Sequence, residues 1–178
     1  DPDGLSAASS LTSVGKTMSE PPLGSGNTYH VAISGNDSNN GSVGSPWRTI
    51  QKATSRVGAG DTVLVHAGQY SGPVQIGSSG ASTNWITFQS AGDGEVIISG
   101  GGFENFSYSY IRIKGFKLTS GAGILMEGGS VHDVIVEDNI VEGSSIQFRN
   151  GPGNITAQRN EVHQISGSGG FGIYFKAA

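Results

Sequence analysis

Short apolar segments recur along this chain about every two dozen residues, and this repeat limits the possible folds more than any other feature. Apolar triplets begin at Val63, Ile86, Ile111, Val134 and Ile155, with successive offsets of 23, 25, 23 and 21 residues. The first and third side chains of a triplet share one face, because side chains alternate along a strand. A repeat of this length, made of short strands and turns, is one coil of a β-solenoid. A sandwich of hairpins would show no constant offset, so we predict an all-β, single-stranded parallel β-helix of about five or six coils.

Two further sets of strands keep the same register. One set comprises residues 116–118, 139–141 and 160–162, and the other comprises residues 124–126, 146–148 and 173–175. Asn139 and Asn160 fall at equivalent turn positions, where asparagine tolerates left-handed backbone geometry. We expect their side chains to stack as a hydrogen-bonded turn ladder.

The composition suits short strands joined by tight turns and excludes several other classes of protein. Glycine is abundant, at 30 residues, but has no three-residue period, so the chain is not collagen-like. The net charge is -4 and no block of Lys or Arg occurs, which argues against binding to nucleic acid or an anionic membrane. No apolar run approaches the ~20 residues that a membrane span needs. The absence of cysteine excludes disulfides and thiolate sites.

Residues 1–28 differ from the rest of the chain. They are rich in Ser, Gly and Pro. Their scattered apolar residues are Leu5, Leu11, Val14, Met18 and Leu23. Such a segment cannot by itself bury enough surface to offset an ordering entropy of ~1–2 kcal/mol per residue. We therefore expect an extended arm that docks on a neighbouring subunit, followed by a β-helix domain over residues 29–178.

One segment has helical spacing. Ser45 and Pro46 suit the N-cap and first position of a helix, and glycines at 58 and 60 suit its end. The apolar face of this helix is formed by Ile50, Ala53 and Val57. The pattern predicts a short capping α-helix near residues 46–57.

Several runs resemble a known superfamily. They are SPWRTIQKA at residues 45–53, GDTVLV at 60–65 and GQY at 68–70. They resemble the start of secreted right-handed β-helix proteins, which include polysaccharide lyases of the pectate-lyase and chondroitinase-B kind. The resemblance covers residues 29–175 and implies a right-handed helix, a capped N-terminal end and an extracellular location. It leaves the activity open, because this superfamily also contains structural and adhesive proteins.

If the chain were a lyase, a Lys or Arg would abstract the proton beside a uronate carboxylate, and Ca²⁺ or an Arg would neutralise that carboxylate. The candidates are Glu137, Asp138 and Glu142 for the cation, and Arg112, Lys114 and Lys117 for the base and clamp. Glu137 and Asp138 also suit solvated turn residues, and Arg112 and Lys114 suit the outer face of a strand. Lyases of this kind usually carry their acting residues in later coils of longer chains. We therefore assign no catalytic residue, no metal site and no cofactor, with Ca²⁺ needed only by a lyase, and we favour a non-enzymatic role.

Other polar residues carry weaker signals. Asn-X-Ser/Thr acceptors for glycosylation occur at Asn36, Asn40, Asn105 and Asn154. Chance in a Ser-rich chain explains them equally well. The histidines are His30, His66, His132 and His163. They share no metal-ligand spacing, so we expect ordinary surface side chains.

The last strand carries apolar residues and no capping segment. They are Phe171, Ile173, Tyr174 and Phe175. An open solenoid end exposes unpaired backbone groups and core residues. Two explanations are open, because either the next coils of a longer protein or another copy could cover this edge. With another copy the contact would be head-to-tail, and such contacts build open filaments unless the rotation closes a ring. The arm would add to the neighbour as a strand.

Our main hypothesis is therefore an extracellular, glycosylated structural subunit that assembles with its own copies into a filament. The alternatives are the N-terminal portion of a secreted Ca²⁺-dependent polysaccharide lyase and a carbohydrate-binding adhesin module. Glycans are candidate partners in each case, whereas nucleic acid and a membrane span are not expected.

Overall fold

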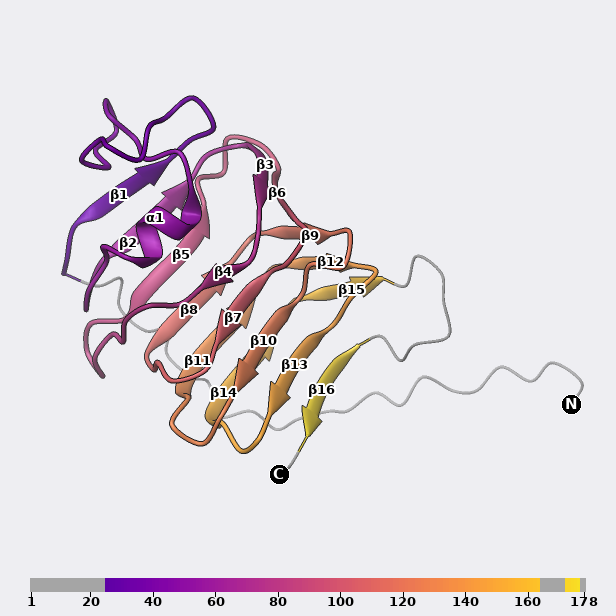
Figure 1. Ribbon diagram of the computed structural model, residues 1–178. Helices are drawn as coiled ribbons and strands as arrows, with labels where there is room; N and C mark the ends of the chain where they lie inside the picture. Colours follow the sequence, from indigo (N-terminus) through magenta and orange to yellow (C-terminus); the bar gives the residue numbers. More distant parts are fainter. Residues whose placement is uncertain (1–24, 164–171, 177–178) are drawn as a thin grey trace, which may run out of the picture.

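Successive coils of the chain stack on one another as a parallel β-helix (Figure 1). The computed structural model describes residues 25–163 and 172–176. Within this part, the strands form one six-stranded sheet and two five-stranded sheets. Each coil contributes one strand to each sheet, and β1 adds a sixth strand to the first sheet at its N-terminal edge. The predicted solenoid is confirmed.

The elements have the following bounds. The first sheet contains β1 (Thr28–Val31), β2 (Thr62–Val65), β5 (Ile86–Ser90), β8 (Ile111–Lys114), β11 (His132–Glu137) and β14 (Gly153–Gln158). The second sheet contains β3 (Gly68–Ser71), β6 (Val96–Ser99), β9 (Lys117–Thr119), β12 (Ile140–Glu142) and β15 (Glu161–His163). The third sheet contains β4 (Val74–Gln75), β7 (Phe103–Asn105), β10 (Ile124–Glu127), β13 (Ile146–Arg149) and β16 (Ile173–Lys176). The helix α1 spans Ile50–Thr54.

The core is a set of stacked apolar columns enclosed by the three sheets. Because register is constant and side chains alternate, an inward residue of one coil lies over an inward residue of the next. Within the enclosed space, rings from different sheets also meet: Phe88 packs on Phe103 of the same coil, and Phe103 on Phe116 of the next, with ring centroids 6.1 and 5.0 Å apart. All three rings are buried. The repeat in the sequence is therefore the repeat of this core.

One predicted offset is wrong by two residues. Val63 pairs with Phe88, an offset of 25, rather than with Ile86. The position one coil before Ile86 belongs to Asp61, whose carboxylate accepts hydrogen bonds from the backbone N–H groups of Gly58 and Asn27. A shift of two leaves every side chain on its predicted face, because the side-chain period of a strand is two.

The cap helix is shorter than predicted and begins later. Thr49 is its N-cap, and its hydroxyl accepts a hydrogen bond from the Lys52 N–H at 3.1 Å. Ser45 and Trp47 are extended instead, because Ser45 bridges to Ser42 and Trp47 bridges to β1. Trp47 also stacks on Tyr29, with ring centroids 4.8 Å apart, and so closes the N-terminal end of the core together with α1.

The predicted asparagine pair stacks across two coils. The Asn139 Nδ2 group donates a hydrogen bond to the Asn160 Oδ1 atom at 3.0 Å, and the Asn139 Oδ1 atom accepts one from the Phe116 N–H at 3.0 Å. The left-handed geometry belongs instead to the preceding residues, with φ values of 55° at Asp138 and 52° at Arg159.

The C-terminal coil exposes apolar side chains. The exposed fractions of Ile173, Tyr174 and Phe175 are 39%, 38% and 68%. Phe175 stacks on Phe148 of the preceding coil at a centroid distance of 4.8 Å. Phe171 lies outside the described residues, and so do the apolar residues of the arm, Leu5, Leu11, Val14, Met18 and Leu23. No helix within the described ranges is long and apolar enough to cross a membrane.

Candidate functional site

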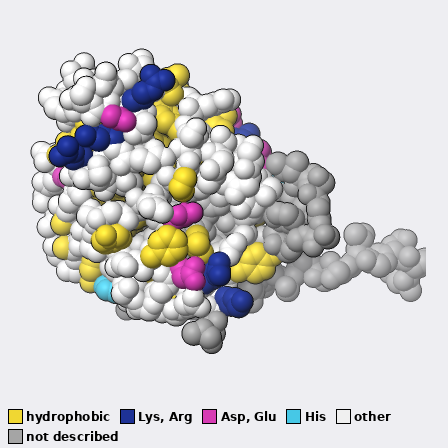
Figure 2. Space-filling view, viewed as in Figure 1, with side chains coloured by type: hydrophobic (Ala, Val, Ile, Leu, Met, Phe, Trp, Pro, Cys, Tyr) yellow, Lys and Arg dark blue, Asp and Glu magenta, His cyan; other side chains and the backbone are white. Residues whose placement is uncertain are grey.

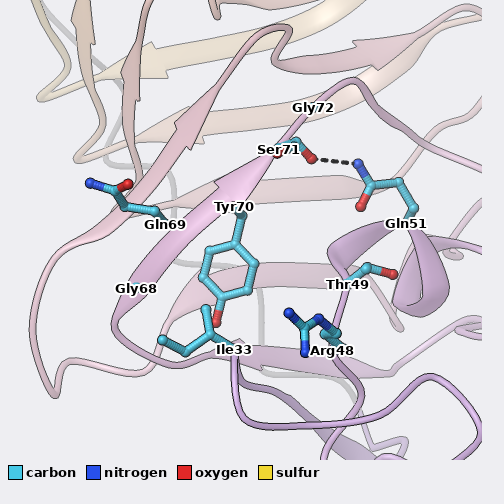
Figure 3. Close-up of a pocket in the computed structure, with 9 residues that line it drawn as sticks. All are labelled: Ile33, Arg48, Thr49, Gln51, Gly68, Gln69, Tyr70, Ser71 and Gly72. Carbon is cyan, nitrogen blue, oxygen red and sulfur yellow. Dashed lines mark hydrogen bonds between the residues drawn. The ribbon is translucent and has the colours of Figure 1, made fainter.

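A groove of about 860 Å³ lies between the N-terminal cap and the second sheet (Figure 3). We call it the cap groove. Its walls come from the loop after β1, from the start of α1 and from β3. The residues that line it are Ile33, Arg48, Thr49, Gln51, Gly68, Gln69, Tyr70, Ser71 and Gly72.

Asp37 holds the cap side of the groove in place. Its Oδ1 atom accepts hydrogen bonds from the Arg48 and Thr49 N–H groups, both at 2.9 Å, and its Oδ2 atom accepts one from the Thr49 hydroxyl at 2.8 Å. Burial works to raise the pKa of Asp37, but the hydrogen bonds from Thr49 and Arg48 outweigh it and keep this pKa below its ordinary value. An ionised Asp37 therefore fixes the segment that carries Arg48.

The floor of the groove is rigid. Tyr70 is buried, and its hydroxyl donates a hydrogen bond to the His66 carbonyl at 2.8 Å. Burial, and then the charge of Asp93, raise the pKa of Tyr70 to about 12, so the hydroxyl remains a donor at neutral pH. At Gly68 the φ of 151° is one that L side chains rarely adopt, and an added Cβ would lie 2.7 Å from the Ile33 Cγ2 atom, so a larger residue would strain this wall.

Polar groups line the rest of the groove. The Gln51 Nε2 group donates hydrogen bonds to the carbonyls of Ser71 (2.7 Å, dashed in Figure 3) and Pro73 (2.8 Å), which ties α1 to β3. Arg48 is exposed, and within the described part of the chain its guanidinium has no carboxylate partner. The groove thus offers one positive charge that has no ion-pair partner among the described residues, beside amide, hydroxyl and apolar groups.

A closed ion network on the first sheet is formed by four residues that are candidates only under the lyase alternative, Arg112, Lys114, Glu137 and Asp138. Glu137 is fully buried, which corrects our expectation of a solvated turn residue. Its carboxylate accepts hydrogen bonds from the Arg112 Nε atom (2.6 Å), the Gln158 Nε2 atom (2.7 Å) and the Arg159 Nη2 atom (2.6 Å). The Lys114 Nζ atom lies 3.6 Å away. Arg112 also differs from the prediction, because it is only 4% exposed although it points outward from β8.

Both carboxylates of this network are held ionised by cations. Burial alone would raise the pKa of Glu137, but hydrogen bonds from Gln158 and Arg112 and nearby positive charge keep it below the ordinary 4.5. Hydrogen bonds from Arg159 lower the pKa of Asp138 in spite of partial burial. A Ca²⁺ ion would have to displace Arg112, Lys114 and Arg159 from these oxygens.

The two remaining candidates, Lys117 and Glu142, lie apart from this network and pair with each other. On the second sheet, the Lys117 Nζ atom is 3.3 Å from a Glu142 carboxylate oxygen and 3.8 Å from a Glu95 oxygen. The structure therefore brings Arg112, Lys114, Glu137 and Asp138 together and leaves Lys117 and Glu142 as a separate pair. Across residues 25–163 and 172–176, no three or more His, Cys, Asp or Glu side chains are arranged to hold a metal ion.

The outer face of the third sheet is open and shallow (Figure 2). Apolar side chains alternate there with acidic and basic ones. A smaller hollow of about 160 Å³ is lined in part by Glu104, Leu125 and Gln147. Glu127 lies at the edge of this face, where its carboxylate is 3.9 Å from the Arg149 guanidinium. This face offers a flat platform, whereas the cap groove is the larger hollow of the two.

Sequence reasoning missed a pair of histidines. The His30 Nδ1 atom lies 2.9 Å from the His66 Nε2 atom, and the His66 Nδ1 atom lies 2.7 Å from the Asp93 Oδ2 atom. The spacing of about one coil between His66 and Asp93 was the available signal, since residues one coil apart become neighbours.

The glycosylation candidates differ in exposure. Asn36, Asn40 and Asn154 are exposed. Asn105 is fully buried, and its Nδ2 group donates a hydrogen bond to the Tyr108 carbonyl at 2.7 Å. The folded protein therefore cannot present Asn105 as an acceptor, which corrects that prediction.

Known proteins resemble this chain mainly in their β-helix. The family model of the Pel9A-like right handed β-helix region matches residues 29–172. The uncharacterized protein YwoF of Bacillus subtilis (strain 168) is 29% identical in an alignment of 139 residues, and the match covers 67% of this chain and 30% of YwoF. The chain thus spans less than a third of this curated relative.

Solved structures share the fold at low identity. A rhamnogalacturonan lyase superposes with a TM-score of 0.55 and 18% identity, over 85% of this chain and 50% of its own. The native GH136 lacto-N-biosidase of Eubacterium ramulus gives a TM-score of 0.61 and 12% identity, over 78% of this chain and 34% of its own. The complex of XylC with xylose gives a TM-score of 0.57 and 16% identity, over 69% of this chain and 41% of its own. At such identities the likeness establishes the fold alone.

Proposed function

This chain belongs to the Pel9A-like right-handed β-helix family, and on that premise we propose that it is a carbohydrate-binding part of a polysaccharide-acting β-helix protein. The names of similar structures support this ligand class, because they include a rhamnogalacturonan lyase, a lacto-N-biosidase and a protein bound to xylose. The proposal includes secretion, since polysaccharides of this kind lie outside cells.

The proposal is carried by the exposed guanidinium of Arg48, which lines the cap groove and has no ion-pair partner among the described residues. Sugars present hydroxyls for hydrogen bonds and apolar ring faces for packing, and the groove offers partners for both. A guanidinium binds a carboxylate with two parallel hydrogen bonds. We therefore propose an oligosaccharide that contains uronic acid, with its carboxylate on Arg48 and its ring beside Ile33.

The proposed role is binding rather than bond cleavage. Within the described coils, the candidate base and clamp residues are paired with carboxylates: Arg112 and Lys114 with Glu137, and Lys117 with Glu142. A lyase needs a base that reaches its substrate. The alternative of a Ca²⁺-dependent lyase predicts unsaturated uronate products, detected by absorbance when Ca²⁺ and pectate, alginate or dermatan are added.

Calorimetric titration with oligogalacturonate and with a neutral xylo-oligosaccharide tests the binding proposal. We expect saturable binding of the acidic ligand only. Arg48→Gln should weaken that binding about tenfold, because it removes one charge-assisted contact. Arg56→Gln is the matched control, since Arg56 is an equally exposed arginine of the cap outside the groove. Equal affinity for both ligands, or an Arg48→Gln variant that binds like the control, would refute the proposal.

Assembly into a filament is the second candidate function. It is favoured by the exposed side chains of β16, Ile173 and Phe175, which continue a buried column of the core. The predicted arm of residues 1–28 is shortened here to residues 1–24, because Asn27 and Thr28 bond to the first coil of their own chain. In this proposal, residues 1–24 add as a strand to a neighbouring copy, and the β16 coil receives that copy. Deletion of residues 1–24, which leaves β1 whole, and Phe175→Lys should each leave monomers by light scattering and electron microscopy. The control is Phe106→Lys, which changes a similarly exposed ring on the side of the helix. Fibres from either test variant, or monomers from the wild type, would exclude this function.

Glycosylation of the exposed acceptors Asn36, Asn40 and Asn154 accompanies both candidate functions. Material from a secreting eukaryotic host should lose mass on treatment with an N-glycanase, and Asn105→Gln should not change that loss.

A further inference from the structure

Three side chains from three successive levels of the stack form one hydrogen-bonded row. His30 comes from β1, His66 from the turn between β2 and β3, and Asp93 from the turn between β5 and β6. The His30 Nδ1 and His66 Nε2 atoms are 2.9 Å apart, and the His66 Nδ1 and Asp93 Oδ2 atoms are 2.7 Å apart. The row therefore joins the cap strand to the first and second coils.

The two imidazoles point straight at each other. Their ring centroids are 5.2 Å apart and the facing nitrogens are 2.9 Å apart, so the difference equals one ring radius on each side. The two nitrogens therefore lie on the line between the centroids, and the ring planes differ by 21°. Rings placed end to end share a proton along the line between them. A metal ion needs two lone pairs that converge on a point beside that line, so this geometry favours a proton over a metal.

The protonation states follow from the acceptor at the end of the row. An ionised Asp93 only accepts hydrogen bonds, so the His66 Nδ1 atom carries a proton. The contact between the histidines then holds one proton, either on His30 when both rings are neutral or on His66 when that ring is charged. If both rings become charged, two N–H groups face each other and two positive charges stand 2.9 Å apart, which breaks the contact.

We propose that His30, His66 and Asp93 form a proton-sensitive latch that stabilises the docked cap strand β1 on the first coil at neutral pH and favours its release in acid. One added proton leaves the latch closed, and the second opens it.

The groups packed around the latch do not replace it in acid. Tyr70 approaches from β3 and donates its hydroxyl to the His66 carbonyl, and it stays neutral across this range because its pKa is raised to about 12. The Ala67 N–H donates to the Asp93 Oδ1 atom at 3.0 Å, which fixes the carboxylate. The hydrogen bond from His66, and then that from Ala67, lower the pKa of Asp93, so this anchor stays charged while His30 titrates.

The direction of the pH effect is set by His30. Burial, and then the nearby His66, lower the pKa of His30 below its ordinary 6.5. Between the lowered pKa of His30 in the closed state and the ordinary 6.5 of the released state, the released state binds more protons than the closed state. Acid therefore favours release. The stabilisation of the closed cap is complete above pH 6.5 and falls as the pH drops toward the lowered pKa of His30.

A histidine NMR titration combined with hydrogen exchange tests the latch without any ligand. His30 should titrate below 6.5 in the wild type and return toward 6.5 in His66→Ala. The His66 N–H, which donates to the Val31 carbonyl at 2.8 Å, reports the docking of β1. Its protection factor should fall between pH 7.5 and pH 5, because the released cap binds a proton more tightly than the closed cap.

His30→Asn separates the latch from a merely structural contact. The amide still hydrogen-bonds the His66 Nε2 atom but does not titrate, so protection of the His66 N–H should no longer change with pH. His163→Asn is the control, because His163 pairs with Glu161 in the last coil, and it should behave like the wild type. Ordinary titration of His30, or an unchanged pH dependence in His30→Asn, would overturn the proposal.

The latch also adjoins the cap groove, whose walls include Ile33 and Gly68 on the same two segments. Weaker saccharide binding at pH 5 than at pH 7.5 is therefore expected, and this consequence alone rests on the proposed function. If no saccharide binds at any pH but the cap opens in acid, the latch stands and the proposed function fails.

Discussion

Two polar rows cross the coils of this β-helix, one at each end of the stack, and they use different chemistry. The His30–His66–Asp93 row joins β1 to the first two coils through two imidazoles and one carboxylate, and the imidazole of His30 gains its proton only in acid. The Arg112–Glu137–Arg159 row joins the last three coils through permanent cations and one buried carboxylate. Constant register makes the members of each row neighbours, and the residue type then decides whether the link is permanent or depends on pH.

Removal of the central carboxylate should have the largest effect. Glu137→Ala takes away the group that Arg112 and Arg159 share, and breaking a buried ion pair costs about 3–5 kcal/mol. Urea denaturation should show this loss in the free energy of unfolding, while the exposed Glu161→Ala should stay within about 0.5 kcal/mol of the wild type. A loss below about 1 kcal/mol for Glu137→Ala would mean that the later coils do not depend on this row.

The pH dependence of stability should separate the two rows. The pKa of Glu137 is lowered by its hydrogen bonds and cations, so its contribution is present above its ordinary 4.5 and is lost as the pH falls through the lowered value. The His30 contribution is lost at higher pH, starting at 6.5. Denaturation series should therefore show two steps, of which His30→Asn removes the upper and Glu137→Gln the lower. A single step that both variants share would contradict separate rows.

An exposed pair should matter least. Lys117 and Glu142 lie 3.3 Å apart with partly exposed side chains, and such pairs contribute about 0–1 kcal/mol. Lys117→Met should change the free energy of unfolding by less than about 1 kcal/mol, and 1 M salt should abolish the difference because charges are screened within about 3 Å there. A large effect that survives salt would show that exposure does not distinguish this pair from the Glu137 network.

The solenoid was predictable because its signal is periodic. The similar offsets between Ile86, Ile111, Val134 and Ile155 reappear as strand pairing, since alternation and stacking act identically in every coil. The misplaced Val63 shows the limit of this reasoning. Where a polar cap residue such as Asp61 takes an inward position, the apolar triplet no longer marks the register.

The site was less predictable because burial depends on neighbouring coils. Glu137 resembles a turn residue in isolation, and only Arg112 one coil before and Gln158 one coil after turn it into a buried acceptor. Helix propensity around Ser45 and Pro46 was likewise overridden, because a β-bridge to β1 uses the backbone of Trp47. The outcome at such positions is fixed by partners distant in sequence.

In the tight turns after β11 and β14, one residue must both adopt a positive φ and carry a charge of an ion pair. Gly115, Asp138 and Arg159 occupy equivalent places in successive coils, all with positive φ, yet the second and third also carry the charges of an ion pair. Glycine at 138 or 159 would relieve a backbone conformation that costs on the order of 1 kcal/mol, but it would delete that charge. Relief of the backbone strain at position 138 or 159 therefore removes the ion pair between them. Asparagine is the compromise to test there, because it accepts left-handed geometry and still forms hydrogen bonds.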